Sequence, residues 1–171
     1  VFLIAFALSK NLRDLALNDA YKDAITNLYN RHNYYRALHK DTPALTPDAT
    51  IESVAQAYAE TIAAAGQLIH SQNSKYGENL YLTASTATPK FTGDEAADKW
   101  YNEITFYDYS NPGWVGSAGH FTQVIWKGST KIGCGAAAGK YNSYNGLYVV
   151  CNYEPPGNYL SRFAANVMPL K

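Results

Sequence analysis

The sequence has no excess of charge of either sign. Lysine plus arginine number 14 and aspartate plus glutamate number 14, so the formal net charge at pH 7 is zero, and charged residues make up 16% of the 171 residues. Proteins that bind nucleic acid or anionic membrane surfaces carry an excess of basic residues. The composition therefore argues against nucleic acid as a partner.

Cysteine is also scarce, with Cys134 and Cys151 as the two copies. Residues 132–140 and 147–153 are typical of strands, and the segment between them is rich in turn-forming residues. A turn near 142–143 would place the two cysteines opposite each other, as a cross-strand disulfide needs. Two buried free thiols remain the alternative at this point.

The chain has no apolar run long enough to span a membrane. Its longest, VFLIAFALS at residues 1–9, lacks an initiating methionine. Residues 1–18 fit two interpretations: the remnant of a signal peptide, or an N-terminal extension whose helix docks on the body or on a second copy to make a homodimer. We expect no stable membrane insertion. Asn-x-Ser/Thr glycosylation acceptors are absent from the sequence.

Helical periodicity is present in several segments, separated by turn formers. We expect helices over 19–38, over 47–66 with Thr46 as cap and Pro47 at the first position, over 94–104, and over 120–126 with Ser117 as cap. The second helix has an apolar stripe of Ile51, Val54, Ala55, Tyr58 and Ile62. Residues 67–90 are interpreted as loop around a short apolar run at 79–82. The pattern predicts one α+β domain over 19–171, with helices around a small antiparallel sheet.

Four residues beside breaks in this pattern could form a site: His70, Glu78, Glu103 and His120. The positive end of a helix dipole at His120 disfavours an imidazolium, and a neutral imidazole can bind a metal or accept a proton. Two imidazoles and two carboxylates in one cleft could hold Zn²⁺ or a similar ion. Their separations of 8, 25 and 17 residues match no local metal motif, so the spacing alone favours separate hydrogen-bonding roles on the surface.

Four short motifs give these residues a context. GHFTQVIWKGS at 119–129 and YVVCNYEPPGNY at 148–159 resemble the two signatures of the CAP superfamily, which groups cysteine-rich secretory proteins, antigen 5 and plant pathogenesis-related class 1 proteins. HNYYR at 32–36 and GENL at 77–80 resemble its two shorter motifs, in the same order. YDYSNPG and NYEPPGNYL are most similar to fungal secreted members.

The resemblance implies a three-layer α-β-α sandwich and a cleft lined by a histidine and glutamate tetrad. Carried over residue by residue, the tetrad is His70, Glu78, Glu103 and His120, and such clefts can take a divalent cation (Zn²⁺, Mg²⁺ or Ca²⁺), although none is required. His32 belongs to the helical HNYYR motif and is expected to be structural. This chain departs from the family in having two cysteines where plant members have six and fungal ones often four.

Sterol and fatty-acid binding are known among the relatives that this chain resembles. The sterol site is credited to an aromatic loop with the spacing found here at Tyr107, Tyr109 and Trp114. These rings could flank a slot for a flat hydrocarbon, or they could pin the loop to the body, and Trp114 could itself fill the slot. An acyl chain could instead lie between the helices at 19–38 and 47–66, because the second is rich in alanine.

The resemblance thus predicts a secreted, extracellular protein that binds and carries a small hydrophobic lipid. Two other classes stay open: a metal-dependent, protease-like hydrolase that uses the tetrad, and a non-catalytic effector recognised by another protein. HExxH and a nucleophile beside a base are both absent from the sequence, so the balance is against an enzyme.

Overall fold

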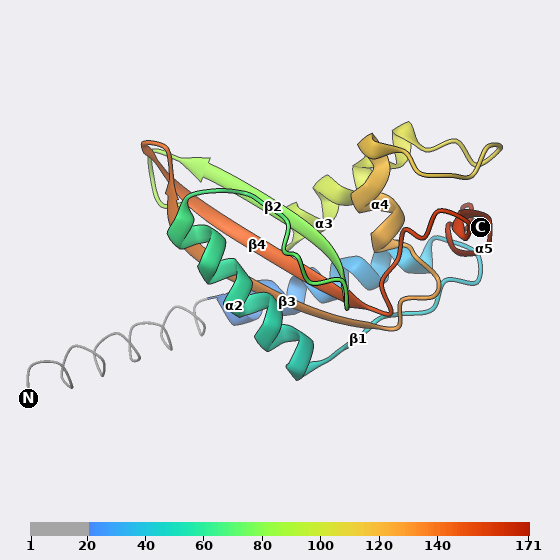
Figure 1. The fold of residues 1–171 in the computed structure, drawn as a ribbon, viewed down its shortest axis with the longest axis horizontal. Helices are drawn as coiled ribbons and strands as arrows, with labels where there is room; N and C mark the ends of the chain where they lie inside the picture. Colours follow the sequence, from blue (N-terminus) through green and yellow to red (C-terminus); the bar gives the residue numbers. More distant parts are fainter. Residues whose placement is uncertain (1–20) are drawn as a thin grey trace, which may run out of the picture.

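The protein is a three-layer sandwich in which helices cover both faces of one sheet (Figure 1). The computed structural model describes residues 21–171, so both interpretations of residues 1–18, and the homodimer proposed through them, lie outside the described residues. After a helix at residues 21–37, the elements are β1 (Thr46–Pro47), α2 (Ala49–Ala65), β2 (Gly77–Ser85), α3 (Asp94–Tyr101), η1 (Asn102–Phe106), η2 (Gly116–Ala118), α4 (Gly119–Val124), β3 (Lys131–Tyr141), β4 (Tyr144–Glu154) and α5 (Phe163–Asn166). This order confirms the predicted α+β sandwich.

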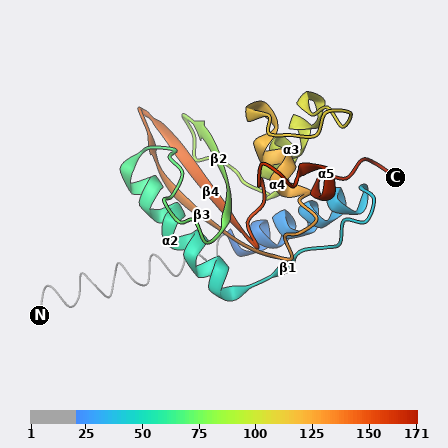
Figure 2. The ribbon, with the colours of Figure 1, turned by 45° about the vertical axis from the view of Figure 1, so that its right-hand side comes forward.

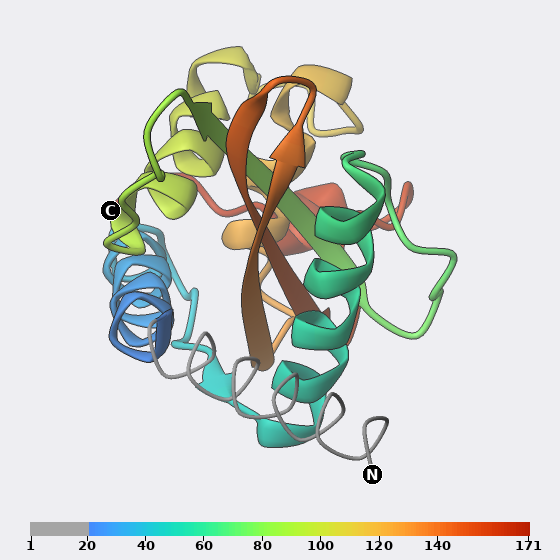
Figure 3. The ribbon, with the colours of Figure 1, turned by 90° about the vertical axis from the view of Figure 1, so that its left-hand side faces the viewer.

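The sheet has the strand order β1-β3-β4-β2. β4 pairs antiparallel with β3 and with β2, and the two-residue β1 adds to β3 in parallel. α2 covers one face, while the helix at 21–37, α3 and α4 cover the other (Figures 2 and 3). The expected antiparallel sheet is therefore confirmed, with a short parallel strand added at its edge.

The hairpin of β3 and β4 forms as predicted. Tyr141 pairs with Tyr144, so the turn consists of Asn142 and Ser143, and Asn142 has a φ of 53° in the left-handed region that asparagine tolerates. Cys134 and Cys151 are directly opposite in this register and form a disulfide with an S–S distance of 1.98 Å. The alternative of two free thiols is wrong.

The assignment of residues 67–90 as loop is wrong at its centre, where β2 forms along the edge of β4. The apolar run at 79–82 is only the middle of that strand. The flanking residues extend because the long strand β4 offers them a full ladder of backbone partners, which local composition does not reveal.

The second helix begins at Ala49, two residues after the predicted start. Thr46 and Pro47 form β1 instead, with the Thr46 N–H donating to the Thr130 carbonyl. Asp48 is the actual cap, because its carboxylate accepts from the N–H groups of Thr50 and Ile51 at 3.0 and 3.2 Å. The third helix is also shorter than predicted, since it tightens into η1 after Tyr101.

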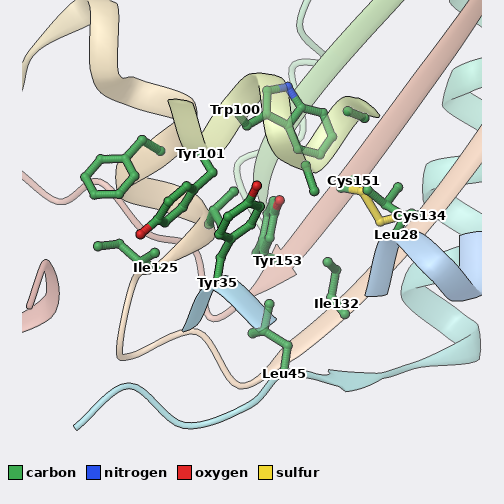
Figure 4. Close-up of a cluster of buried hydrophobic side chains, with 14 of the residues drawn as sticks. Leu28, Tyr35, Leu45, Trp100, Tyr101, Ile125, Ile132, Cys134, Cys151 and Tyr153 are labelled. Atoms are coloured by element: carbon green, nitrogen blue, oxygen red, sulfur yellow. A yellow bond between two sulfur atoms is a disulfide. The ribbon is translucent and has the colours of Figure 1, made fainter. Parts of the chain in front are cut away.

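The two faces of the sheet have different cores. The face toward the helix at 21–37, α3 and α4 holds large aromatic side chains, the disulfide and aliphatic residues (Figure 4); among them are Leu28, Tyr35, Trp100, Tyr101, Ile132, Cys134, Cys151 and Tyr153. The face toward α2 holds Ala55, Ala59, Ile62, Ala63, Leu80, Tyr148 and Val150. Within the predicted stripe of α2, Val54 and Tyr58 are only half-buried, so they are available to line a groove.

Candidate functional site

His120 and Glu103 form a close pair between α4 and η1. The Nδ1 atom of His120 lies 2.7 Å from Oε1 of Glu103, and the two side chains are 36% and 19% exposed. The ring of Trp100 lies roughly parallel to the imidazole, with centroids 6.3 Å apart. The pair therefore ties η1 to the start of α4 and leaves part of the imidazole open to solvent.

Glu103 also caps the helix that carries His120. Its Oε2 atom accepts from the backbone N–H groups of His120 and Phe121 at 3.0 and 3.2 Å. The predicted cap, Ser117, lies in η2, and the residue at the N-cap position is Ala118. α4 starts at Gly119 and ends at Val124, two residues before the predicted end. The Glu103 carboxylate, from another element, takes the place of a cap residue next to the helix. Capping patterns in the local sequence cannot indicate such a long-range cap.

His70 and Glu78 form the second pair, between the loop after α2 and the start of β2. The Nδ1 atom of His70 lies 2.8 Å from Oε1 of Glu78, and the Ser71 N–H donates to the same oxygen at 2.9 Å. The side chain of His70 is 60% exposed and that of Glu78 is 8% exposed. The hydrogen bond to Glu78 raises the pKa of His70. Burial opposes ionisation of Glu78, but the hydrogen bonds from His70 and Ser71 outweigh it and lower the pKa of the carboxyl.

The two pairs lie on opposite faces of β2. Side chains alternate along a strand, so Glu78 shares the α2 face with Leu80, whereas Asn79 points to the other face. There the Nδ2 atom of Asn79 donates to the His120 carbonyl at 3.1 Å. Within residues 21–171, no group of three or more His, Cys, Asp or Glu side chains is positioned to hold a metal ion. The structure thus brings the four predicted residues together as two pairs.

A buried chain of hydrogen bonds links the helix at 21–37 to the His120 backbone. Nδ1 of His32 donates to the Leu28 carbonyl and Nε2 accepts from the Tyr153 hydroxyl, each at 2.7 Å, and Asn79 donates to that hydroxyl at 3.2 Å. Burial lowers the pKa of His32 to about 4, so the neutral ring that this chain requires is favoured. The structural role expected for His32 is confirmed, although the residue joins a helix to β4 and does not hold a loop.

Arg36 is a further positioning residue that the sequence analysis passed over. It is fully buried and donates to four backbone carbonyls: those of Pro43 at 2.7 Å, Val124 and Trp126 at 2.9 Å, and Ser129 at 3.0 Å. Burial lowers its pKa to about 10. The HNYYR motif could have indicated this role for Arg36. An arginine between apolar positions of a helix either faces solvent or donates to buried acceptors.

The aromatic loop is divided between the core and the surface. Tyr107 is buried and its ring meets that of Tyr109 edge-on at 5.0 Å, while Trp114 is 52% exposed and lies over Gly119. The two tyrosine hydroxyls are buried and have no hydrogen-bond partner within the described residues. Burial raises the pKa of both hydroxyls, and the nearby Gly113 amide offsets part of the effect at Tyr107 without forming a hydrogen bond of standard geometry. Two of the three predicted rings therefore pin the loop inward, and the third is available at the surface.

A groove of about 550 Å³ lies between the helix at 21–37 and α2. It is lined by Tyr21, Lys22, Ile25, Thr26, Tyr29, Glu52, Ser53, Gln56, Ala57, Glu60 and Cys134. Gln56 donates to and accepts from the backbone of Ala136, and Tyr29 accepts from the Cys134 N–H. The Gln56 and Tyr29 side chains thus supply hydrogen-bond partners to the part of β3 that does not pair with β1. The β3 backbone groups at the floor of the groove therefore have their hydrogen bonds satisfied.

None of the described helices is both long enough and apolar enough to cross a bilayer.

Comparison with known proteins identifies the family. The CAP model, described as the cysteine-rich secretory protein family, matches residues 29–153. PRY2 of Saccharomyces cerevisiae is 49% identical over 150 residues, covering 86% of this chain and 42% of that protein. Human Golgi-associated plant pathogenesis-related protein 1 is 38% identical over 145 residues, covering 82% and 89%, and secreted protein RBT4 of Candida albicans is 40% identical over 133 residues, covering 75% and 34%.

Two of these three relatives are thus much longer than the region that this chain matches. Among solved structures, BmVAL-1 superposes with a TM-score of 0.68 at 24% identity, covering 81% of this chain and 79% of that one, which supports the fold. The family match includes the motifs around His32, Glu78, Glu103 and His120. The chain belongs to the CAP family of cysteine-rich secretory and pathogenesis-related proteins.

Proposed function

We propose that this chain is a secreted lipid carrier, which binds a fatty acid or a sterol outside the cell. Secretion is supported by the disulfide, because such bonds persist in oxidising compartments, and by the relative RBT4, which is named a secreted protein. The lipid function rests on the groove between the helix at 21–37 and α2, whose volume of about 550 Å³ is in the range of small-molecule sites.

The charge of the groove favours one orientation for a fatty acid. Lys22 is the single basic residue among those that line it, and Glu52 and Glu60 line it as well. Glu52 already accepts a hydrogen bond from the Tyr29 hydroxyl at 2.9 Å. A lipid carboxylate would therefore lie toward Lys22, with the acyl chain against Ile25 and Ala57, away from the two acids.

A sterol would use the aromatic loop. The exposed face of Trp114 offers the first contact, and the buried hydroxyls of Tyr107 and Tyr109 offer partners to a ligand hydroxyl. Because both tyrosine rings are packed inward, sterol entry requires the loop to open. The preformed groove therefore favours a fatty acid over a sterol.

In this proposal the two His–Glu pairs hold the segments around them in place and do not perform turnover. By type, two imidazoles and two carboxylates suit Zn²⁺, and here they are arranged as two His–Glu pairs. Calorimetry with Zn²⁺ tests the expectation of a divalent cation. If the tetrad is the site, replacing His70 and His120 together by alanine abolishes the heat of binding, and undiminished heat excludes it.

Equilibrium binding of labelled palmitate and labelled cholesterol tests the lipid proposal. Thr26→Trp fills the groove from an exposed position and should abolish palmitate binding, while Asn30→Trp, exposed on the same helix outside the groove, should not. Trp114→Ala should weaken cholesterol binding and leave palmitate unchanged. Absence of saturable binding of either lipid to the wild type would overturn the carrier function.

A further inference from the structure

A second groove lies on the opposite flank of α2, between this helix and the segment that leads into β2. Its volume is about 520 Å³. It is lined by Thr50, Ser53, Val54, Ala57, Tyr58, Thr61, Ser71, Asn73, Glu78 and Asn152. The walls are mostly small or apolar side chains of α2, and Ala57, Thr61 and Asn73 are exposed at the rim. Ser53 and Ala57, on the outer side of α2, border both this groove and the lipid groove, and the other lining residues of the two grooves differ.

Two of the residues that line this groove each carry a buried acceptor. Oε2 of Glu78 and Oδ1 of Asn152 are buried and have no hydrogen-bond partner anywhere in residues 21–171. The two residues are directly opposite in the β2–β4 register, so their side chains emerge side by side. The Glu78 side chain is 8% exposed and Asn152 is 1% exposed. Buried acceptors without a partner are costly, and a pair of them in one groove points to a ligand that donates.

The local hydrogen bonds explain why one carboxylate oxygen is left over. The donors from His70 and Ser71 both bind Oε1 of Glu78. The hydroxyl of Tyr58, which also lines the groove, donates to the Ile69 carbonyl at 2.7 Å and is not directed to Glu78. The described part of the chain thus supplies Oε1 with two donors and Oε2 with none.

The charge of the groove restricts the ligand further. Glu78 is the one charged residue among its lining residues, and none of those residues is lysine or arginine. Lys75, in the adjoining loop, already lies 3.9 Å from a Glu154 oxygen and over the ring of Tyr76. An anionic head group would face the Glu78 carboxylate, whose partner His70 is already hydrogen-bonded to Oε1, whereas an ammonium would be paired and hydrogen-bonded.

We propose that this groove binds a primary amine with an apolar body, whose ammonium group donates to Glu78 Oε2 and Asn152 Oδ1 while the body lies along Val54 and Tyr58. An ammonium has three donors, so it satisfies both acceptors and keeps one for water or for a rim hydroxyl. The site borders the lipid groove at Ser53 and Ala57 but has its own polar groups, and it does not depend on the lipid function.

Titration of ¹⁵N-labelled protein with 4-phenylbutylamine tests the site. The matched alcohol, 4-phenylbutanol, and the matched acid, 4-phenylbutanoate, have the same body and differ in the head group. The amine should cause saturable shifts at the residues that line this groove alone, among them Val54, Tyr58, Thr61, Glu78 and Asn152. The alcohol should bind at least about tenfold more weakly because it lacks the charge, and the acid should not bind. Equal affinity for amine and acid, or no saturable shift with the amine, would overturn the proposal.

Four variants locate the effect. Glu78→Gln keeps the shape and removes the charge, so the affinity for the amine should fall at least about tenfold. Because this change also loosens His70, Thr61→Trp provides an independent test: it blocks the groove from an exposed position, and Ala64→Trp, exposed on the same helix outside the groove, is its control. Thr61→Trp should abolish amine binding and leave palmitate binding intact, whereas Thr26→Trp should do the reverse. Unchanged amine binding in both Glu78→Gln and Thr61→Trp would refute the site.

Discussion

The two faces of the sheet are built by different means. The face toward the helix at 21–37, α3 and α4 is filled by aromatic rings, the disulfide and a buried polar network around His32 and Arg36. The face toward α2 is thin, because three glycines of β3 let the helix backbone approach the strand. A Cβ atom added at Gly133, Gly135 or Gly139 would lie 2.1–2.3 Å from the α2 backbone.

The difference explains where the grooves lie. On the thin face, the buried alanines Ala55, Ala59 and Ala63 of α2 contact the sheet. The groove between α2 and the helix at 21–37 is lined instead by the exposed Ala57. A helix that lies this close to a sheet leaves its flanks open, and each flank carries one groove. The opposite face, filled by aromatic rings and called the thick face below, instead fixes the position of α4 and therefore of His120. We expect substitutions on the thick face to cost stability and those on the thin face to change binding.

The largest loss of stability should follow Arg36→Met. This change leaves four backbone carbonyls without their donor, three of them buried, and we expect a loss of about 3–5 kcal/mol in the free energy of unfolding. Arg31→Met is the control, since the Arg31–Asp98 pair is about a third exposed and should contribute less than about 1 kcal/mol. Urea denaturation of both variants measures the contrast. A loss below 1 kcal/mol for Arg36→Met would show that water can replace the guanidinium.

Removal of the disulfide should have the next largest effect. Cys134 and Cys151 are 17 residues apart and fully buried, so the bond restricts a loop of the unfolded chain and stabilises the fold by about 3 kcal/mol. We expect a decrease in Tm of roughly 6–12 °C for the double variant Cys134→Ala/Cys151→Ala in thermal unfolding. Reducing agent should produce a similar decrease in the wild type and none in the variant.

Acidification should destabilise the thick face through His32. The folded protein holds this ring neutral with a pKa of about 4, against an ordinary value of 6.5. The unfolded chain therefore binds the proton first, and stability that is fully present above pH 6.5 is lost as the pH falls. Between pH 7 and pH 5 the loss should be about 2 kcal/mol. Burial lowers the pKa of His39 as well, which adds to the same trend.

Urea denaturation at several pH values measures this loss. His32→Gln should be less stable at pH 7 and should show a flatter dependence on pH than the wild type. Parallel profiles for the two proteins would exclude His32 as the source.

Close approach on the thin face is tested by Gly135→Ala. The added Cβ atom would lie 2.3 Å from the Cα atom of Gln56, so α2 must move away from β3, at a cost of about 1–2 kcal/mol. Gly116→Ala is the control, because a Cβ atom there meets no atom within 4 Å. Urea midpoints of the two variants compare the effects. The affinity for palmitate or for phenylbutylamine should also change in Gly135→Ala, since both grooves border α2.

Local signals in the sequence predicted the helices, the β3–β4 hairpin and the disulfide, because periodicity and turn residues are properties of neighbouring positions. They did not reveal β2 or β1, whose residues extend because strands far along the chain pair with them. The same limit applies to the site. The four tetrad residues were identified through the family resemblance, but Glu103 as the cap of α4 and Asn79 as the link to His120 depend on distances that only the fold provides.

The smallest expected effect concerns His70, whose pH dependence has the opposite sign to that of His32. Its pKa is raised above 6.5 by Glu78, so its contribution is fully present below pH 6.5 and is lost as the pH rises through the raised value. The pKa of Glu78 is lowered from 4.5, so its contribution is present above pH 4.5 and is lost at lower pH. His70→Gln should therefore differ most from the wild type between about pH 4.5 and 6.5, by the 0.2–1 kcal/mol typical of an exposed pair. Thermal unfolding at pH 5.5 and pH 8.5 measures the difference, and an equal loss at both values would assign the effect to packing and not to charge.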